Sequence, residues 1–173
     1  MKPLFLVGYM GCGKSTLGRR LARRLGVDFV DTDALVEQLE GASVADVFRY
    51  EGEQRFREVE RDVLERVLAG GCEAVVSTGG GLPVWRDNMR RMNEVGVTVF
   101  LRRTAEQIAR RLSPYGRQKR PRLRGLSDSE LVAFMARDMA EREPFYAQAR
   151  IEIDCSVLTD EQALERILER LEN

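Results

Sequence analysis

The residues with the clearest chemical potential lie near the start of the chain. Residues 8–16 read Gly-Tyr-Met-Gly-Cys-Gly-Lys-Ser-Thr and follow directly on an apolar run at residues 4–7. A glycine, four further residues and then Gly-Lys-Ser, between a strand and a helix, form the phosphate-loop pattern. Its glycines let backbone N–H groups turn inward, and the helix that follows adds its own unpaired N–H groups. A plain glycine-rich turn is the alternative, but both flanking segments favour a nucleoside triphosphate site, with Lys14 at the β- and γ-phosphates and Ser15 as a ligand of Mg²⁺.

Composition limits the kind of protein that carries this loop. The 173 residues suit one domain, and 28 basic residues balance 28 acidic ones, so nothing points to nucleic acid or to a membrane surface as partner. No apolar run approaches the roughly 18 residues of a membrane span. Histidine is absent. Catalysis must therefore use carboxylate, lysine, arginine and magnesium.

The cysteines and the N-terminal residues indicate the compartment. Cys12, Cys72 and Cys155 are too few and too scattered for a disulfide framework or a zinc site. A strand directly after residues 1–3 leaves no room for a signal peptide, so we expect a cytoplasmic protein. Cys12 lies inside the loop, beside a helix N-terminus and Lys14, which suggests oxidation-sensitive nucleotide binding. That it is simply small enough to fit is the favoured alternative.

Apolar runs alternate with helical patterns along the whole chain. Such alternation predicts an α/β fold in three layers, with a five-stranded parallel sheet between helices. Residues 113–125, rich in basic residues and containing two prolines and two glycines, are expected to form a loop or lid, and Pro144 to interrupt a helix. We expect strands at 4–7, 28–31, 74–77, 97–101 and 151–154, and helices at 14–25, 33–40, 43–48, 53–69, 87–94, 104–112, 127–142 and 159–171.

Polar residues and glycines follow several of these strands. In parallel sheets ligands bind at the carboxyl ends of the strands, which here carry the phosphate loop, Asp31 with Asp33, and the glycine triplet 79–81. We expect these features to converge on one cleft. Arg57, with Glu60 one helical turn further on, could bind a carboxylate bidentately, although taken alone it is more simply a solvated helix arginine. The base-reading and switch signatures of GTPases are absent, which argues against a regulatory GTPase.

Taken together, six motifs in order and spacing resemble shikimate kinases, over nearly the whole chain. The resemblance implies a P-loop fold of the nucleoside monophosphate kinase type, comprising one domain (1–173) with a mobile lid at about 113–126. It also implies a monomer that transfers the ATP γ-phosphate to the 3-hydroxyl of shikimate, within the chorismate pathway to aromatic amino acids. The motifs are residues 8–16, Asp31-Thr32-Asp33, Phe56-Arg57 with Glu60, Gly79-Gly80-Gly81, Arg120-Pro121 and Arg142-Glu143-Pro144-Phe145-Tyr146.

The resemblance also implies roles for individual residues. Catalytic roles fall to Lys14, Asp33 and Arg120, and Asp33 either accepts the hydroxyl proton or only positions the substrate. Mg²⁺ would be held by Ser15 and, through water, by Asp31. The shikimate contacts would be Asp33, Arg57, Gly80 and Arg142. The ATP contacts would be Gly11, Cys12, Gly13, Lys14, Ser15, Thr16, the adenine-stacking Arg111 and the lid residue Arg120.

The lid departs from the family pattern. Shikimate kinases usually read Arg-Pro-Leu-Leu where this chain has Arg120-Pro121-Arg122-Leu123, and the stretch before it, with Arg117 and Lys119, is longer. Arg122 either touches phosphate or is merely solvated, and lids expose charge often enough to favour the second. Residues 155–158 match no adenine-flanking loop of the family. Two other functions stay open: a related kinase for another small hydroxy acid such as gluconate, and an ATP-binding module without catalysis.

Overall fold

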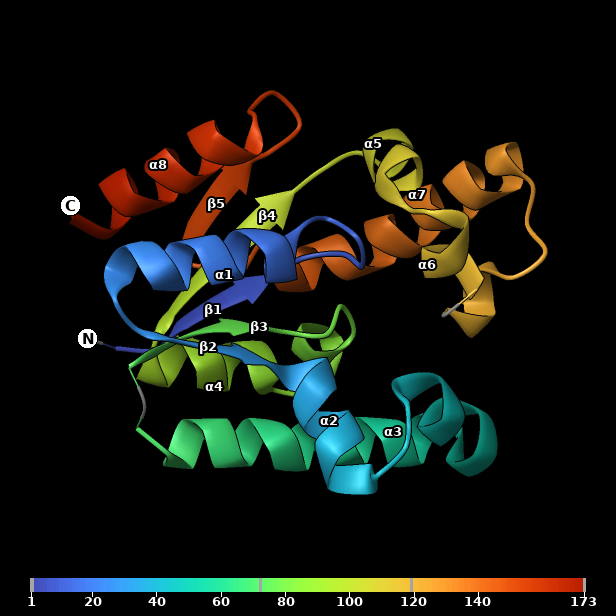
Figure 1. Ribbon diagram of the computed structural model, residues 1–173, viewed down its shortest axis with the longest axis horizontal. Coiled ribbons are helices and arrows are strands. Elements are labelled where there is room, and N and C mark those ends of the chain that lie inside the picture. Colours follow the sequence, from blue (N-terminus) through green and yellow to red (C-terminus); the bar gives the residue numbers. More distant parts are fainter. Residues whose placement is uncertain (1, 72, 119, 173) are drawn as a thin grey trace.

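The computed structural model describes residues 2–71, 73–118 and 120–172, so that Cys72 and Lys119 lie outside the described residues. These residues form one five-stranded sheet in which all strands run parallel, in the order β2-β3-β1-β4-β5 (Figure 1). The predicted five-stranded parallel sheet is therefore confirmed. The strands are β1 (Leu4–Val7), β2 (Asp28–Asp31), β3 (Ala74–Ser77), β4 (Val97–Arg102) and β5 (Ile151–Asp154).

Helices cover both faces of the sheet and give three layers. α1 and α8 pack on one face, and α3 and α4 lie beyond the other (Figure 1). A short 3-10 turn follows β3 and another follows α6. The helices are α1 (Lys14–Leu25), α2 (Thr32–Glu40), α3 (Val44–Ala69), α4 (Asn88–Val95), α5 (Ala105–Arg111), α6 (Pro114–Gln118), α7 (Asp128–Tyr146) and α8 (Asp160–Glu172), and the 3-10 turns are η1 (Leu82–Val84) and η2 (Pro121–Leu123).

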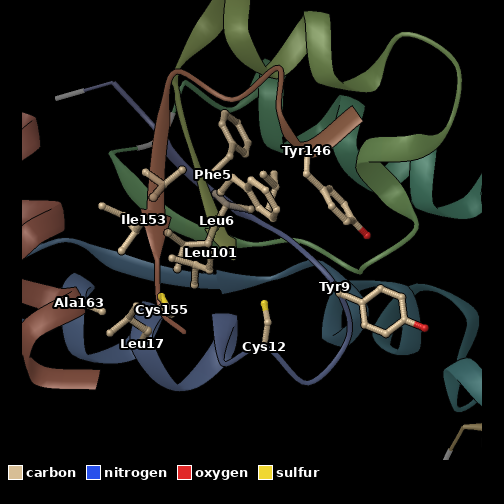
Figure 2. Packing of buried hydrophobic residues seen from close by; sticks show 14 of the residues in the cluster. Phe5, Leu6, Tyr9, Cys12, Leu17, Leu101, Tyr146, Ile153, Cys155 and Ala163 are labelled. Atoms are coloured by element: carbon tan, nitrogen blue, oxygen red, sulfur yellow. The ribbon is translucent and has the colours of Figure 1, made fainter. Parts of the chain in front are cut away.

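The core lies between the sheet and its helices. β1 and β3 are buried along their whole length, because helices cover both of their faces, and their sequences are accordingly apolar almost throughout. Figure 2 shows Leu6, Leu101 and Ile153 of three neighbouring strands close together. In the same view Leu17 of α1 and Ala163 of α8 pack on one side of them. This rigid layer holds the strand ends from which the polar loops extend.

The predicted break between residues 48 and 53 is confirmed. Gly52, with a φ of 86° and a ψ of 168°, is not helical, so α3 consists of two helical segments that meet at a kink. The expectation that Pro144 interrupts a helix is wrong, since α7 continues to Tyr146. Proline removes one N–H donor and its ring crowds the carbonyl four residues earlier, but α7 continues for two residues beyond it. The helix end is held instead by Tyr146, which is buried and donates a hydrogen bond from its hydroxyl to the carbonyl of Gly80.

The basic segment 113–125 is more ordered than the loop predicted for it. It contains α6 and η2, and the hydroxyl of Ser113 accepts the N–H of Gly116 at the start of α6. Leu123 is buried in the main core and anchors η2 there. An apolar anchor, a capping hydroxyl and hydrogen bonds from Arg117, Arg120 and Arg124 thus give local structure to a segment of low hydrophobicity.

Candidate active site

The phosphate loop connects β1 to α1 in a conformation that requires glycine. Gly8, Gly11 and Gly13 have φ angles of 141°, 74° and 107°, which other residues rarely adopt. A Cβ on Gly8 would also lie 2.8 Å from the carbonyl oxygen of Leu101. The glycines of the motif therefore serve the fold of the loop as well as its expected contact with phosphate.

Lys14, the first residue of α1, is enclosed by the loop. Its Nζ donates hydrogen bonds of 2.8 Å to the carbonyl oxygens of both Gly8 and Tyr9. The side chain is buried, so its charge lies inside the curve of the loop. An ammonium group held there suits the neutralisation of a triphosphate.

Asp31 joins the phosphate loop to the end of β2. The Ser15 hydroxyl donates to Oδ2 of Asp31 at 2.7 Å and lies 3.1 Å from Oγ of Ser77. Oδ1 of Asp31 accepts the N–H of Asp33 and so caps α2. A hydroxyl and a carboxylate are the oxygen ligands that Mg²⁺ prefers. Ser77 went unnoticed in the sequence, although its place at the end of β3 could have indicated it.

These residues line one pocket, called here the donor pocket. It collects almost all of the predicted ATP contacts. Cys12 is the exception, because its side chain is 1% exposed and belongs to the apolar core (Figure 2). The donor pocket is lined by Met10, Gly11, Gly13, Lys14, Ser15, Thr16, Asp31, Asp33, Ser77, Thr78, Gly80, Arg111, Leu112 and Arg120.

Two arginines, one lining the donor pocket and one behind the phosphate loop, pair with Asp160. Arg111 lines the pocket and pairs with Asp160 at 3.2 Å. Arg103 is buried and donates to the carbonyl oxygens of Cys12 and Cys155, both at 2.9 Å, while a third nitrogen reaches Asp160 at 2.6 Å. Arg103 thus ties the phosphate loop to the segment after β5. Arg103 stands in no motif, so no sequence pattern indicated this role.

A second pocket, called here the acceptor pocket, adjoins the first. It contains the predicted shikimate contacts Asp33, Arg57, Gly80 and Arg142 together. Asp33 and Arg120 line both pockets, so the two sites meet there. The expected convergence of the strand ends is therefore confirmed. The acceptor pocket is lined by Met10, Asp33, Val44, Ala45, Phe48, Glu53, Phe56, Arg57, Gly79, Gly80, Gly81, Arg120, Arg122 and Arg142.

The glycine triplet leaves room for charged side chains. A Cβ on Gly79 would lie 2.6 Å from Oδ1 of Asp33 and 2.8 Å from Oε1 of Glu60. The same atom on Gly81 would collide with the guanidinium of Arg57. These glycines allow the backbone to approach the acceptor side chains closely, which holds them in place.

Asp33 occupies the boundary between the two pockets. Burial and, next, the neighbouring carboxylate of Asp31 raise the pKa of Asp33, while Lys14 and Arg120 act in the opposite direction. A carboxylate with a raised pKa is better suited to accept a proton from a hydroxyl. The environment therefore fits either of the two roles expected of Asp33.

Arg57 is not a solvated helix arginine. Its side chain is 12% exposed, and Nη1 donates to Oε2 of Glu60 at 2.5 Å. The expectation that Glu60 fixes this guanidinium is confirmed. Glu60 itself is buried, and burial raises its pKa to about 7 although Arg57 lowers it.

Arg142 approaches the acceptor pocket from α7. Its guanidinium lies 5.5 Å from the centre of the Tyr9 ring and 3.2 Å from Oδ2 of Asp138. Tyr9 donates its phenolic proton to the same carboxylate at 2.7 Å. Figure 2 shows the hydroxyls of Tyr9 and Tyr146 pointing away from the aliphatic core. Asp138, Tyr9 and Tyr146 were not predicted from the sequence as site residues.

Two arginines of the segment that is expected to form the lid line the site. Arg120 donates to the carbonyl oxygen of Gly116 at 2.6 Å, and burial lowers the pKa of its guanidinium. The favoured interpretation of Arg122 as a merely solvated side chain is wrong. Although its side chain is 45% exposed, it lines the acceptor pocket and pairs with Asp138 at 3.4 Å.

The fold and the two pockets define a class of protein. A phosphate loop with an enclosed lysine, a Ser–Asp pair suited to Mg²⁺ and an adjoining pocket rich in arginine indicate a P-loop kinase for a small anionic acceptor. The family model described as shikimate kinase matches residues 10–172. The chain belongs to the shikimate kinase family, as its motifs predicted.

Individual relatives agree with this assignment. The shikimate kinase of Parabacteroides distasonis is 43% identical over 93% of this chain and 92% of its own length. The crystal structure of shikimate kinase from Bacteroides thetaiotaomicron matches with a TM-score of 0.90 at 40% identity, over 99% of both chains. Shikimate kinase from Acinetobacter baumannii in complex with shikimate matches with a TM-score of 0.88 at 30% identity, over 99% of this chain and 93% of that one. These matches confirm the predicted fold class.

Proposed function

We propose that this chain transfers the γ-phosphate of ATP to the 3-hydroxyl of shikimate, giving shikimate 3-phosphate and ADP. The observation that carries the proposal is the pair of adjoining pockets that share Asp33 and Arg120. One pocket contains the phosphate loop, and the other presents Arg57 and Arg142. The Acinetobacter relative in complex with shikimate supports the choice of acceptor. No comparison favours the gluconate kinase alternative.

In the donor pocket the chain's task is to place and neutralise the phosphates. Lys14 and the backbone N–H groups of residues 11–16 receive the phosphates, and Arg111 borders the base. Ser15 and Asp31 would hold Mg²⁺, which supplies charge neutralisation at the β- and γ-phosphates when bound. The 2.7 Å bond between their side chains supports this assignment, since it aligns both oxygens on the same side of the pocket. Among the described residues no cluster of three or more acidic or cysteine side chains offers a separate metal site.

In the acceptor pocket the chain orients the second substrate. The planar guanidinium groups of Arg57 and Arg142 match the carboxylate of shikimate, and Gly80 lets the backbone approach the shikimate ring. Asp33 accepts a hydrogen bond from the reacting hydroxyl at the point where the pockets meet. Positioning and charge neutralisation account for most of the catalysis of phosphoryl transfer, and Arg120 supplies positive charge to the transferring group from the lid.

Asp33 has two possible roles that differ in proton transfer. As a base it takes the hydroxyl proton during transfer; as a positioning residue it only orients the hydroxyl. The raised pKa of Asp33 supports the first role. Its location at the boundary of the two pockets supports both.

The remaining expectations form part of the same proposal. Residues 1–173 would act as one domain, with residues 113–126 as a lid that closes over both substrates. The protein would work as a monomer in the cytoplasm. None of the described helices combines the length and apolar character of a membrane span. The lid role is supported by Arg120, which lies between the two pockets.

The test is ADP release measured with the purified protein, ATP, Mg²⁺ and a panel of small hydroxy acids. We expect shikimate to stimulate release and to be recovered as the 3-phosphate, whereas gluconate has no effect. The Lys14→Met variant controls for contaminating kinases, since it should lose the activity. ADP release that is stimulated by gluconate instead, or that is stimulated by none of the acids, contradicts the proposal.

A further inference from the structure

The carboxylate of Asp138 connects three separate parts of the site. Its Oδ2 accepts a 2.7 Å hydrogen bond from the Tyr9 hydroxyl of the phosphate loop and forms an ion pair with Nη2 of Arg142 at 3.2 Å. Its Oδ1 accepts Nη1 of Arg122, from the lid, at 3.4 Å. The lid and α7 lie at the same end of the molecule, beyond the phosphate loop (Figure 1). One carboxylate therefore joins a donor element, an acceptor arginine and the lid.

Burial makes these contacts matter. Asp138 is 7% exposed, and a carboxylate removed from water is stable only when its oxygens find charged or hydrogen-bonding partners. Arg142 is similarly buried, at 11%, and is held over the Tyr9 ring. The orientation of Arg142 in the acceptor pocket thus depends on where Asp138 and Tyr9 hold it.

Arg122 differs from the other two partners because it comes from the lid. Its guanidinium lies 5.1 Å from the centre of the Phe134 ring of α7, and its side chain remains 45% exposed. Both contacts join the lid to a single helix. Any displacement of residues 120–123 away from α7 would break them, since a distance of 3.4 Å is already near the limit of a hydrogen bond.

We propose that Arg122 and Asp138 form a latch that ties the lid to the acceptor pocket, with Asp138 as the positioning residue of Arg142. The latch couples lid position to acceptor binding. When Arg122 is paired with Asp138, the carboxylate divides its interaction between the guanidinium groups of Arg122 and Arg142. Arg142 is then less tightly bound to Asp138 and keeps more of its hydrogen-bonding capacity for the acceptor carboxylate. The acceptor named here rests on the proposed function, but the latch itself does not.

The competing explanation is that Arg122 binds the acceptor directly. It lines the acceptor pocket, so its charge could meet the carboxylate without Asp138. The two explanations differ in their dependence on Asp138. A latch loses its effect when Asp138 is removed, whereas a direct contact keeps it.

A double-mutant cycle on shikimate kinetics separates them. Arg122→Leu should raise the KM for shikimate about three- to ten-fold, with smaller changes in kcat and in the KM for ATP. Asp138→Asn should raise the same KM, and adding Arg122→Leu to it should change KM less than about two-fold. Arg122→Lys, which keeps the charge, should recover most of the loss. The matched control is Arg124→Leu, because Arg124 is exposed and donates to the lid carbonyl of Gln118.

Two kinetic outcomes would overturn the latch. If Arg122→Leu raises KM as much in the Asp138→Asn background as in the wild type, Arg122 acts on the acceptor directly. If Arg124→Leu has the same effect as Arg122→Leu, the total charge of the lid is responsible.

A readout without substrate keeps the latch separate from the proposed function. Hydrogen exchange of residues 113–126 should be several-fold faster in Arg122→Leu and in Asp138→Asn than in wild type, and unchanged in Arg124→Leu. If shikimate does not stimulate the wild-type protein while the variants show this exchange pattern, the proposed function is disproved and the latch is supported. Unchanged exchange in Arg122→Leu would overturn the latch. Should Asp138→Asn fail to fold, hydrogen exchange of Arg122→Leu without substrate decides the question, because a side chain that only contacts the acceptor has no effect on exchange when the acceptor is absent.

Discussion

The hydroxyl of Ser15 donates a 2.7 Å hydrogen bond to Oδ2 of Asp31. Ser15 belongs to the first turn of α1, and Asp31 is the last residue of β2. The bond therefore joins the start of α1 to the carboxyl end of β2, at the edge of the sheet where substrates are expected. Asp31 also caps α2 through the N–H of Asp33. One carboxylate thereby fixes the relative positions of a proposed metal ligand and a proposed acceptor contact.

Asp31→Asn should weaken the response of the enzyme to Mg²⁺. The amide carries no charge and orients Ser15 less firmly, so the Mg²⁺ concentration for half-maximal activity should rise about ten-fold or more. Titration of activity with Mg²⁺ at saturating ATP measures this shift. Asp28→Asn, at the exposed start of the same strand, is the control. Equal Mg²⁺ responses of the two variants would exclude Asp31 from the metal site.

Lys14→Met should lower kcat by about 100-fold or more, because the charge at the transferring phosphate is lost. The substitution also leaves the carbonyl oxygens of Gly8 and Tyr9 without their partner, which costs about 1–3 kcal/mol of stability. Kinetics and urea unfolding measure the two effects separately. Lys2→Met serves as the control outside the site. A Lys14→Met protein that retains most of its activity would remove the lysine from the chemistry.

Asp33→Asn should abolish turnover while ATP still binds. The amide cannot take a proton and orients the hydroxyl less well, so kcat should fall by at least about 100-fold. Nucleotide affinity, measured by calorimetry, should change little, because the phosphates lie with the loop. Asp62→Asn, exposed on α3, is a matched control. Near-normal turnover would contradict both roles proposed for Asp33.

Glu60 should make the protein less stable as pH rises. Because burial raises its pKa to about 7, above the ordinary 4.5, the folded state favours the protonated acid. The stabilisation is complete below about pH 4.5 and is lost as pH rises through about 7. Between pH 5 and 8 the wild type should therefore lose about 2 kcal/mol relative to Glu60→Gln.

Urea unfolding at both pH values tests this difference. Glu58→Gln is the control, since Glu58 lies exposed on the same helix and should keep the pH dependence of the wild type. If the wild type and Glu60→Gln depend on pH in the same way, Glu60 is not the group responsible.

Cys12 should resist oxidation in the folded protein. Its side chain is 1% exposed, and its Sγ lies 3.1 Å from the position of a Cβ on Gly8, so a small residue is what the loop requires. Peroxide at concentrations that modify exposed thiols should leave Cys12 and the activity intact, as mass spectrometry of the loop peptide would show. Modification of Cys12 with loss of ATP binding would favour the oxidation-sensitive alternative instead.

Local pattern was enough to predict the scaffold and much of the site. The phosphate loop, the five strands, Asp33 and Arg57 with Glu60 could be found because each depends on residues close in sequence. Strand ends of a parallel sheet meet at one edge, so these motifs were bound to converge. The course of α7 past Pro144 could not be predicted, because the buried Tyr146 and its bond to the Gly80 carbonyl offset the missing donor.

Local sequence pattern is enough to recognise the family, the donor loop and the types of residue that line the acceptor pocket. Which distant side chains contact one another depends on tertiary packing. Tyr9, Arg122, Asp138 and Arg142 come from the phosphate loop, η2 and α7, and Arg103 reaches two carbonyl oxygens in different loops. Asp138 and Arg142 are four residues apart on α7 and follow the helical spacing rule, but no such rule links them to Tyr9 or Arg122, because the packing of whole elements determines which distant groups meet.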